Sequence, residues 1–145
     1  MLTAEFISKL FQLIGFIVGL GAVTVIDWHG FMGQKSVYWT KATVSAHKIT
    51  KPLIWTGTIL LLVGKIIKLN LVGLTDLMFV EFLLMFLLIL NGCFLSFYVS
   101  PYLLKLEKKG ITKPLPSSLQ SKIKISFIFS LLGWWSLVFL FILYK

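Results

Sequence analysis

The sequence predicts an all-α fold: an integral membrane four-helix bundle with an additional interfacial helix leading into the second span. Hydrophobic residues make up 58% of the 145 residues and charged residues only 13%, whereas soluble domains contain about 45–50% apolar and about 25% charged residues. Uncharged stretches recur four times along the chain, and three of them reach the length that a membrane helix needs. None alternates between polar and apolar residues, so helices are expected rather than a barrel.

All of residues 1–145 are assigned to a single transmembrane domain. We expect its spans at about residues 8–27, 49–68, 77–100 and 123–144. Before the first span, Glu5 accompanies Lys9, and no small-residue cleavage motif precedes Asp27. Both observations favour a membrane helix over a cleaved signal peptide. The same span carries Gly15 and Gly19, a GxxxG pair of the kind that lets membrane helices approach closely.

The segment before the second span is expected to form a helix in the cytoplasm or at the membrane interface. Ser36 is a suitable N-cap, and apolar residues at helical spacing give the segment partial amphipathic character. Pro52 is expected to open or kink the span that follows. That span reaches membrane length when Lys51 and Lys65 lie at its two ends and extend their ammonium groups toward water.

The third and fourth spans have small-residue faces of their own. Gly92 and Ser96 lie four residues apart in the third span, and Ser126, Ser130 and Gly133 form a stripe along the fourth. Small residues mark the contact faces of membrane helices. We expect these faces to pack within the chain rather than to form a homodimer seam.

The connector between the third and fourth spans, residues 105–122, is predicted to be free of helix. It contains Gly110, Pro114, Pro116 and two serines, which are residue types that break helices. Its lysines are expected to face anionic lipid, at about 1 kcal/mol for each lysine near the surface.

Lysines are distributed unequally between the two sides of the predicted bundle. The chain has 14 basic residues, all of them lysine, and 5 acidic residues, which gives a net charge of +9. Ten lysines fall in the first loop and in the third loop counted from Lys105 through Lys124, and four fall on the opposite side (Lys9, Lys65, Lys68 and Lys145). The positive-inside rule then places the lysine-rich loops in the cytoplasm and both termini outside the cytoplasmic (inner) membrane. Because nucleic-acid readout favours arginine, the charge indicates topology and no nucleic-acid partner.

Ionisable residues at the cytoplasmic boundary are the leading candidates for chemistry. Asp27 and His29 close the first span and His47 precedes the second, so the three converge if these spans are antiparallel neighbours. Three interpretations stay open. The first is a hydrogen-bonded boundary cluster, the second is haem b held between His29 and His47, and the third is a metal or proton-relay site that uses Asp27 with the histidines. No cofactor is predicted outright, and haem b is the alternative.

Two further polar residues belong to the third span. Asn91 is the one amide deep within a span, and it is expected to make an interhelical hydrogen bond worth about 0.6 kcal/mol. Glu81 lies near the outer end, where Lys65 and Lys68 lie at the matching end of the second span. We expect an exposed ion pair there, contributing about 0–1 kcal/mol. A substrate-binding role would require Glu81 to face the bundle interior.

No enzyme constellation emerges from the sequence, so no catalytic residue is predicted. We expect a structural, anchoring or assembly component of the membrane whose partners are the lipid bilayer and either copies of itself or a membrane complex. The first alternative is a haem-b redox protein that uses His29 and His47. The second is a transporter of a small solute or ion in which Asp27 and Asn91 line a path. Four short spans leave little room for alternating access without oligomerisation.

Three strings resemble a loosely defined group of uncharacterised bacterial four-span inner-membrane proteins. They are GLGAVTVID in the first span, NGCFLSFYVSP in the third and the WW pair in the fourth. The positions that match the group are Asp27, Asn91, Gly92, Pro101 and Trp134 or Trp135. The group often has a histidine where this chain has Ser96 or Phe97, so a haem or metal ligand implied at that position is missing here. The architecture is also similar, at the fold level alone, to four-helix membrane cytochromes and copper-resistance membrane proteins.

Overall fold

The computed structural model describes residues 3–33, 36–110, 113 and 115–143, and within these ranges it is all helical, with no strand. The elements are α1 (Ala4–Gly33), α2 (Val37–Val72), α3 (Asp76–Phe94), the π-helical turn η1 (Leu95–Val99), α4 (Ser100–Lys108) and α5 (Ser117–Leu143). The all-α prediction is confirmed. Because α3, η1 and α4 follow one another without a break, the described chain forms four long helical segments, each long and apolar enough to cross a membrane.

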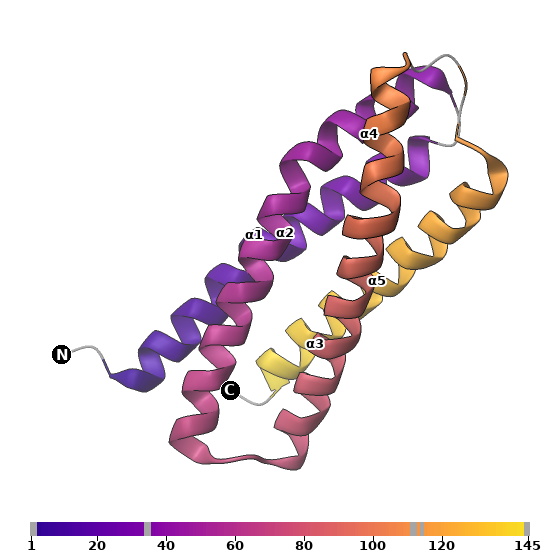
Figure 1. Ribbon diagram of the computed structural model, residues 1–145. Helices are drawn as coiled ribbons and strands as arrows, with labels where there is room; N and C mark the ends of the chain where they lie inside the picture. Colours follow the sequence, from indigo (N-terminus) through magenta and orange to yellow (C-terminus); the bar gives the residue numbers. More distant parts are fainter. Residues whose placement is uncertain (1–2, 34–35, 111–112, 114, 144–145) are drawn as a thin grey trace.

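The four long segments run alternately up and down (Figure 1). The helices α1 and α2 form a closely packed hairpin, and α5 packs against both α1 and α3. The last turns of α1 and α4 and the first turns of α2 and α5 lie at one end, which we call the Lys-rich end (Figure 1). Its described lysines are Lys41, Lys48, Lys51, Lys105, Lys108, Lys109, Lys113, Lys122 and Lys124. Lys35, Pro114, Tyr144 and Lys145, which also entered the predictions, lie outside the described residues.

The predicted interfacial helix and the second span form one continuous helix, α2. Ser36 caps it as predicted, since its Oγ accepts a hydrogen bond from the backbone N–H of Trp39 at 3.3 Å. Pro52 lies within α2 without ending it.

The connector is shorter than predicted. Residues 105–122 were expected to lack helix, but only residues 109–116 lie between α4 and α5. The two serines begin α5 instead of breaking a helix, because the Pro116 carbonyl oxygen accepts the N–H of Gln120 at 3.0 Å and closes the first turn. The burial of Leu119 in an apolar cluster at the Lys-rich end holds this turn against the bundle.

Glycines hold α1 and α2 at short range. A Cβ atom added to Gly57 would lie 2.5 Å from the Gly19 Cα, and one added to Gly15 would lie 2.8 Å from the Gly57 carbonyl oxygen. A Cβ atom added to Gly64 would lie 2.7 Å from the Gln12 Cγ. The predicted GxxxG face is therefore a contact within the chain.

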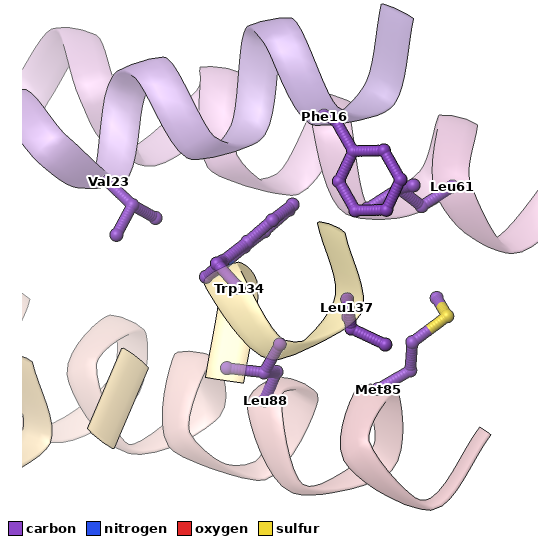
Figure 2. Packing of buried hydrophobic residues seen from close by; sticks show 7 residues of the cluster. All are labelled: Phe16, Val23, Leu61, Met85, Leu88, Trp134 and Leu137. Carbon is purple, nitrogen blue, oxygen red and sulfur yellow. The ribbon is translucent and has the colours of Figure 1, made fainter. Parts of the chain in front are cut away.

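An apolar layer crosses the middle of the bundle. It consists of Phe16, Val23, Leu61, Met85, Leu88, Trp134 and Leu137, none of which is more than 9% exposed. Figure 2 shows Trp134 of α5 in the centre, with Val23 and Phe16 of α1 on one side and Leu88 of α3 on the other. Gly19 makes room for the Trp134 ring, because a Cβ atom there would overlap the indole.

Candidate functional site

The central cavity lies on the Lys-rich side of the apolar layer, between the α1–α2 hairpin and the other helices. It has a volume of about 60 Å³ and is lined from α1 through α5. Val23, Leu88 and Trp134 of the apolar layer close its inner end. The polar residues of its wall are Asp27, Thr43, His47, Lys51, Thr58, Asn91, Ser96 and Ser130.

Asp27 and His47 bring buried, unpaired polar atoms to this cavity. The Asp27 Oδ2 and the His47 Nε2 are both buried, and neither has a hydrogen-bond partner among the described residues. In folded proteins roughly 90% or more of such groups are hydrogen-bonded, and leaving one unpaired costs about 1–3 kcal/mol. Because the two residues come from two helices and line one cavity, this cavity is the candidate site.

His29 lies apart from this arrangement. Its Nδ1 donates to the Val25 carbonyl oxygen at 2.8 Å, and its ring lies edge-on to Trp39 with the ring centroids 6.1 Å apart. It is not among the residues that line the cavity with His47. In the part of the chain that the structure describes, no three His, Cys, Asp or Glu side chains come together as a metal site. Asp27 and His47 thus line one cavity, and His29 lies outside its lining.

The π-helical turn η1 forms one wall of the cavity. The Trp55 Nε1 of α2 donates to the Ser96 Oγ at 3.0 Å, and the Lys51 Nζ donates to the Ser96 carbonyl oxygen at 3.4 Å. Pro101 follows this turn and has no backbone N–H to donate. In a regular α-helix its ring would also clash with the carbonyl group one turn earlier, and the wider π-helical turn relieves that clash. Turns of this kind recur at functional sites. The sequence marks Ser96 as a departure from a family pattern and as part of a small-residue contact face, but it does not identify α2 as the partner of that face.

Asn91 makes the predicted interhelical hydrogen bond. Its Nδ2 donates to the Ser126 carbonyl oxygen at 3.1 Å, and the Ser126 Oγ donates back to the Asn91 Oδ1 at 2.5 Å. This reciprocal pair ties α3 to α5 beside the cavity. The sequence identified the amide, and the structure identifies its partner.

Lys65 and Glu81 form an ion pair on the other side of the apolar layer. The Lys65 Nζ lies 2.8 Å from the Glu81 Oε2, and the two side chains are 0% and 2% exposed. The sequence predicted the pairing, but its expected exposure is wrong. Lys65 lies four residues after Leu61 and Glu81 four residues before Met85. At that spacing the charged residues share the inward faces of α2 and α3 with the apolar layer.

A second pocket, of about 340 Å³, opens at the end of the bundle opposite the Lys-rich end. We call it the outer pocket; its lining is Glu5, Ser8, Lys9, Gln12, Lys68, Leu71, Val72 and Phe141. The Lys9 Nζ pairs with the Glu5 Oε1 at 2.7 Å, and the Ser8 Oγ donates to the Gly64 carbonyl oxygen at 2.8 Å. The sequence does not predict this pocket. Its one indication is that two polar residues, Ser8 and Gln12, lie four residues apart in α1 and so share one face of that helix.

A comparison of the chain with known protein families, curated proteins and solved structures finds no match in any of the three. The resemblance to four-span bacterial proteins therefore stays a prediction from the sequence.

Proposed function

We propose that the protein is an integral protein of the cytoplasmic membrane that moves a small ion or polar solute through its interior. The observation that carries this proposal is the pair of buried, unpaired atoms of Asp27 and His47 on one cavity. Ionisable residues inside membrane proteins typically mark ion and substrate pathways. Asn91, the second residue of the predicted path, lines the same cavity.

The membrane setting is supported by the outer surface of the helices. Large apolar side chains such as Ile17, Phe97 and Ile125 are 66%, 78% and 69% exposed. Helices that are apolar on all sides suit a lipid environment. With 36 residues, α2 is about 54 Å long, whereas the hydrocarbon core is about 30 Å thick. We infer that its first turns extend from the core as the interfacial helix.

The size of the cavity limits what can pass. A volume of about 60 Å³ accommodates roughly two water molecules, at the share of about 30 Å³ that each occupies in the liquid. This suits an inorganic ion, a proton carried by water, or a solute of very few atoms.

The predicted structural or anchoring role rests on the consistent small-residue faces and on the lack of a buried ligand set, and those faces were expected to pack within the chain. Gly15, Gly19 and Gly57 face one another within the α1–α2 hairpin. Gly133 packs against Leu88, where a Cβ atom would lie 2.7 Å from the Leu88 Cδ2. The intrachain packing of these faces fits either role, and the buried, unpaired atoms of Asp27 and His47, which both line the cavity, are what favour transport over assembly.

The test is a flux assay in liposomes with a panel of inorganic ions and protons. The Asp27→Asn variant keeps the size of the side chain and removes its charge, so we expect the flux to fall at least tenfold. The matched control is Asp76→Asn, which changes an exposed acid at the start of α3 outside the cavity. Liposomes with the wild-type protein that pass none of these species faster than empty liposomes contradict the proposal, as does an unchanged flux in Asp27→Asn.

The orientation is a separate part of the proposal. By the positive-inside rule the Lys-rich end lies in the cytoplasm and both termini lie outside. A reporter fused after Lys145 that is active in the cytoplasm contradicts this orientation.

A further inference from the structure

The ion pair of Lys65 and Glu81 is poorly satisfied for a buried pair of charges. The 2.8 Å contact is the one polar contact that the Lys65 Nζ and the Glu81 Oε2 make among the described residues. An ammonium has three donors and a carboxylate about four acceptor sites. Removing two charges from water carries a penalty of several kcal/mol per ion, which is recovered only with additional hydrogen bonds. Two apolar side chains would join α2 and α3 at least as well, so packing does not explain the pair.

The pair faces the same interior as the central cavity. Lys65 follows His47 by 18 residues, which is five full turns of an α-helix, so both occupy one face of α2. Thr58, the nearest polar residue of the cavity wall on α2, lies seven residues before Lys65, or about 10 Å along the helix axis. The pair is therefore a second ionisable site along one line through the bundle.

The apolar layer separates the two sites. Leu61 of α2 and Met85 of α3 lie between the pair and the cavity, at 1% and 3% exposure. A metal ion or an inorganic anion would have to lose its hydration shell to cross this layer, at a large energetic penalty. A proton crosses by exchange between titratable groups and a few transient water molecules, so it needs no open channel.

We propose that Lys65 and Glu81 form a proton-exchange site, so that the species the protein moves is a proton. This inference depends on the proposed function and narrows its substrate class. A proton that arrives binds the Glu81 carboxylate and leaves the Lys65 ammonium without its counter-charge. The ammonium then releases one of its protons on the other side of the site and becomes a neutral amine. Transfer of the carboxyl proton to that amine restores the ion pair, so one proton has entered and one has left.

The outer pocket lies on the same side of the apolar layer as the pair and close to it along α2, although neither Lys65 nor Glu81 lines it. Gln12, which lines the pocket, packs against Gly64, the residue directly before Lys65. Among the described residues, the other charged groups on this side are Lys68, one turn further along α2, Asp76 at the exposed start of α3, and the exposed Lys9–Glu5 pair of α1. From α5 the nearby residues are apolar, Leu137 in the layer and Phe141 at the pocket.

The test replaces both charges with apolar side chains of similar size. In a double variant, Lys65→Met with Glu81→Leu, we expect an unchanged helix content and an unfolding temperature at or above that of the wild type, because such replacements of buried ion pairs are often neutral or stabilising. Proton flux, measured with a pH-sensitive dye inside liposomes under a K⁺ diffusion potential, is expected to fall at least tenfold. The control is Lys109→Met, an exposed lysine between α4 and α5, which is expected to keep the flux within twofold.

A second measurement uses the unmodified chain and does not depend on the folding of a variant. An apolar carbodiimide reacts with protonated carboxyl groups in apolar surroundings, and peptide mass spectrometry locates the label. We expect labelling at Glu81 and a loss of proton flux in proportion to it. The proposal is overturned if the protein with labelled Glu81 keeps its full proton flux. It is also overturned if the protein conducts protons while Glu81 carries no label at a saturating concentration of the reagent.

The outcomes separate this inference from the proposed function. If the wild type moves K⁺, Na⁺ or Cl⁻ but no protons, or if the folded double variant keeps its proton flux, the proton-exchange site is overturned and transport through the cavity stands. If the wild type moves none of these species, the proposed function itself fails.

Discussion

The Gly57→Ala variant tests the closest contact in the bundle. The added Cβ atom would lie 2.5 Å from both the Cα and the N of Gly19, and 2.8 Å from the Gly15 carbonyl oxygen. Carbon atoms at optimal separation lie about 3.5–4.0 Å apart. All three obstacles belong to the backbone, so no side-chain rotation relieves them, and α1 has to move away from α2 by about 1 Å.

The expected loss of stability follows from this displacement. A gap of about 0.5–1 Å removes a quarter to a half of the dispersion energy of each contact that it opens. Overpacking costs about 1–3 kcal/mol, and the rigid obstacles at Gly57 place this site at the upper limit. Alanine regains about 1 kcal/mol of helix propensity over glycine, which leaves a net loss of about 2 kcal/mol. For a chain of this size that corresponds to a fall in the unfolding temperature of roughly 4–8 °C.

The measurement is thermal unfolding in detergent, followed by tryptophan fluorescence. The matched control is Gly21→Ala in α1, where an added Cβ atom meets no heavy atom within 4 Å. The Gly21→Ala variant gains the same helix propensity without a clash of the added Cβ atom, so its unfolding temperature is expected to stay the same or to rise. If Gly57→Ala unfolds at the wild-type temperature, or if both variants are destabilised equally, the close approach of α1 and α2 at this position is refuted.

Three further predictions concern the packing and polar contacts. Leu61→Ala removes a side chain that is 1% exposed in the apolar layer and should lower the free energy of unfolding by about 2–5 kcal/mol; a loss below 1 kcal/mol in SDS titration contradicts this. Asn91→Leu breaks both hydrogen bonds with Ser126 and should cost about 1 kcal/mol at roughly 0.6 kcal/mol per bond, with the same assay as the check. Glu107→Gln breaks the partly exposed ion pair with Lys48 and should change the free energy of unfolding by less than about 1 kcal/mol; a larger loss shows that this pair fixes α4 against α2.

The sequence was informative wherever the local pattern determines the structure. Ser36 was predicted as an N-cap from its residue type and position, and its side chain accepts the expected hydrogen bond. The glycine pair of α1 marked a contact face because only small residues permit such close approach. Asn91 was expected to find a partner because an amide in lipid has no water to bond with.

The sequence was less informative where the outcome depends on the neighbouring helices. Whether Lys65 and Glu81 are exposed depends on how α2 and α3 are rotated, and the charges themselves suggested the surface. The connector appeared free of helix because its composition favours turns, whereas the burial of Leu119 extends α5 into it. The convergence of Asp27 with His47 rather than with His29 depends on the register between α1 and α2, which the single sequence does not specify.

The position of the ion pair bears on why the bundle keeps it. Leu61 and Met85 lie one helical turn from Lys65 and Glu81 on the same inward faces, so continuing the apolar layer by one turn would have satisfied packing. The pair instead carries a desolvation penalty of several kcal/mol per ion, which one 2.8 Å contact offsets only in part. Proteins depart from local rules of this kind mainly at functional sites. On the other side of the apolar layer, the unpaired atoms of Asp27 and His47 also break the rule that buried polar groups are hydrogen-bonded. The ion pair and these unpaired atoms are explained together if charge passes between the two sites.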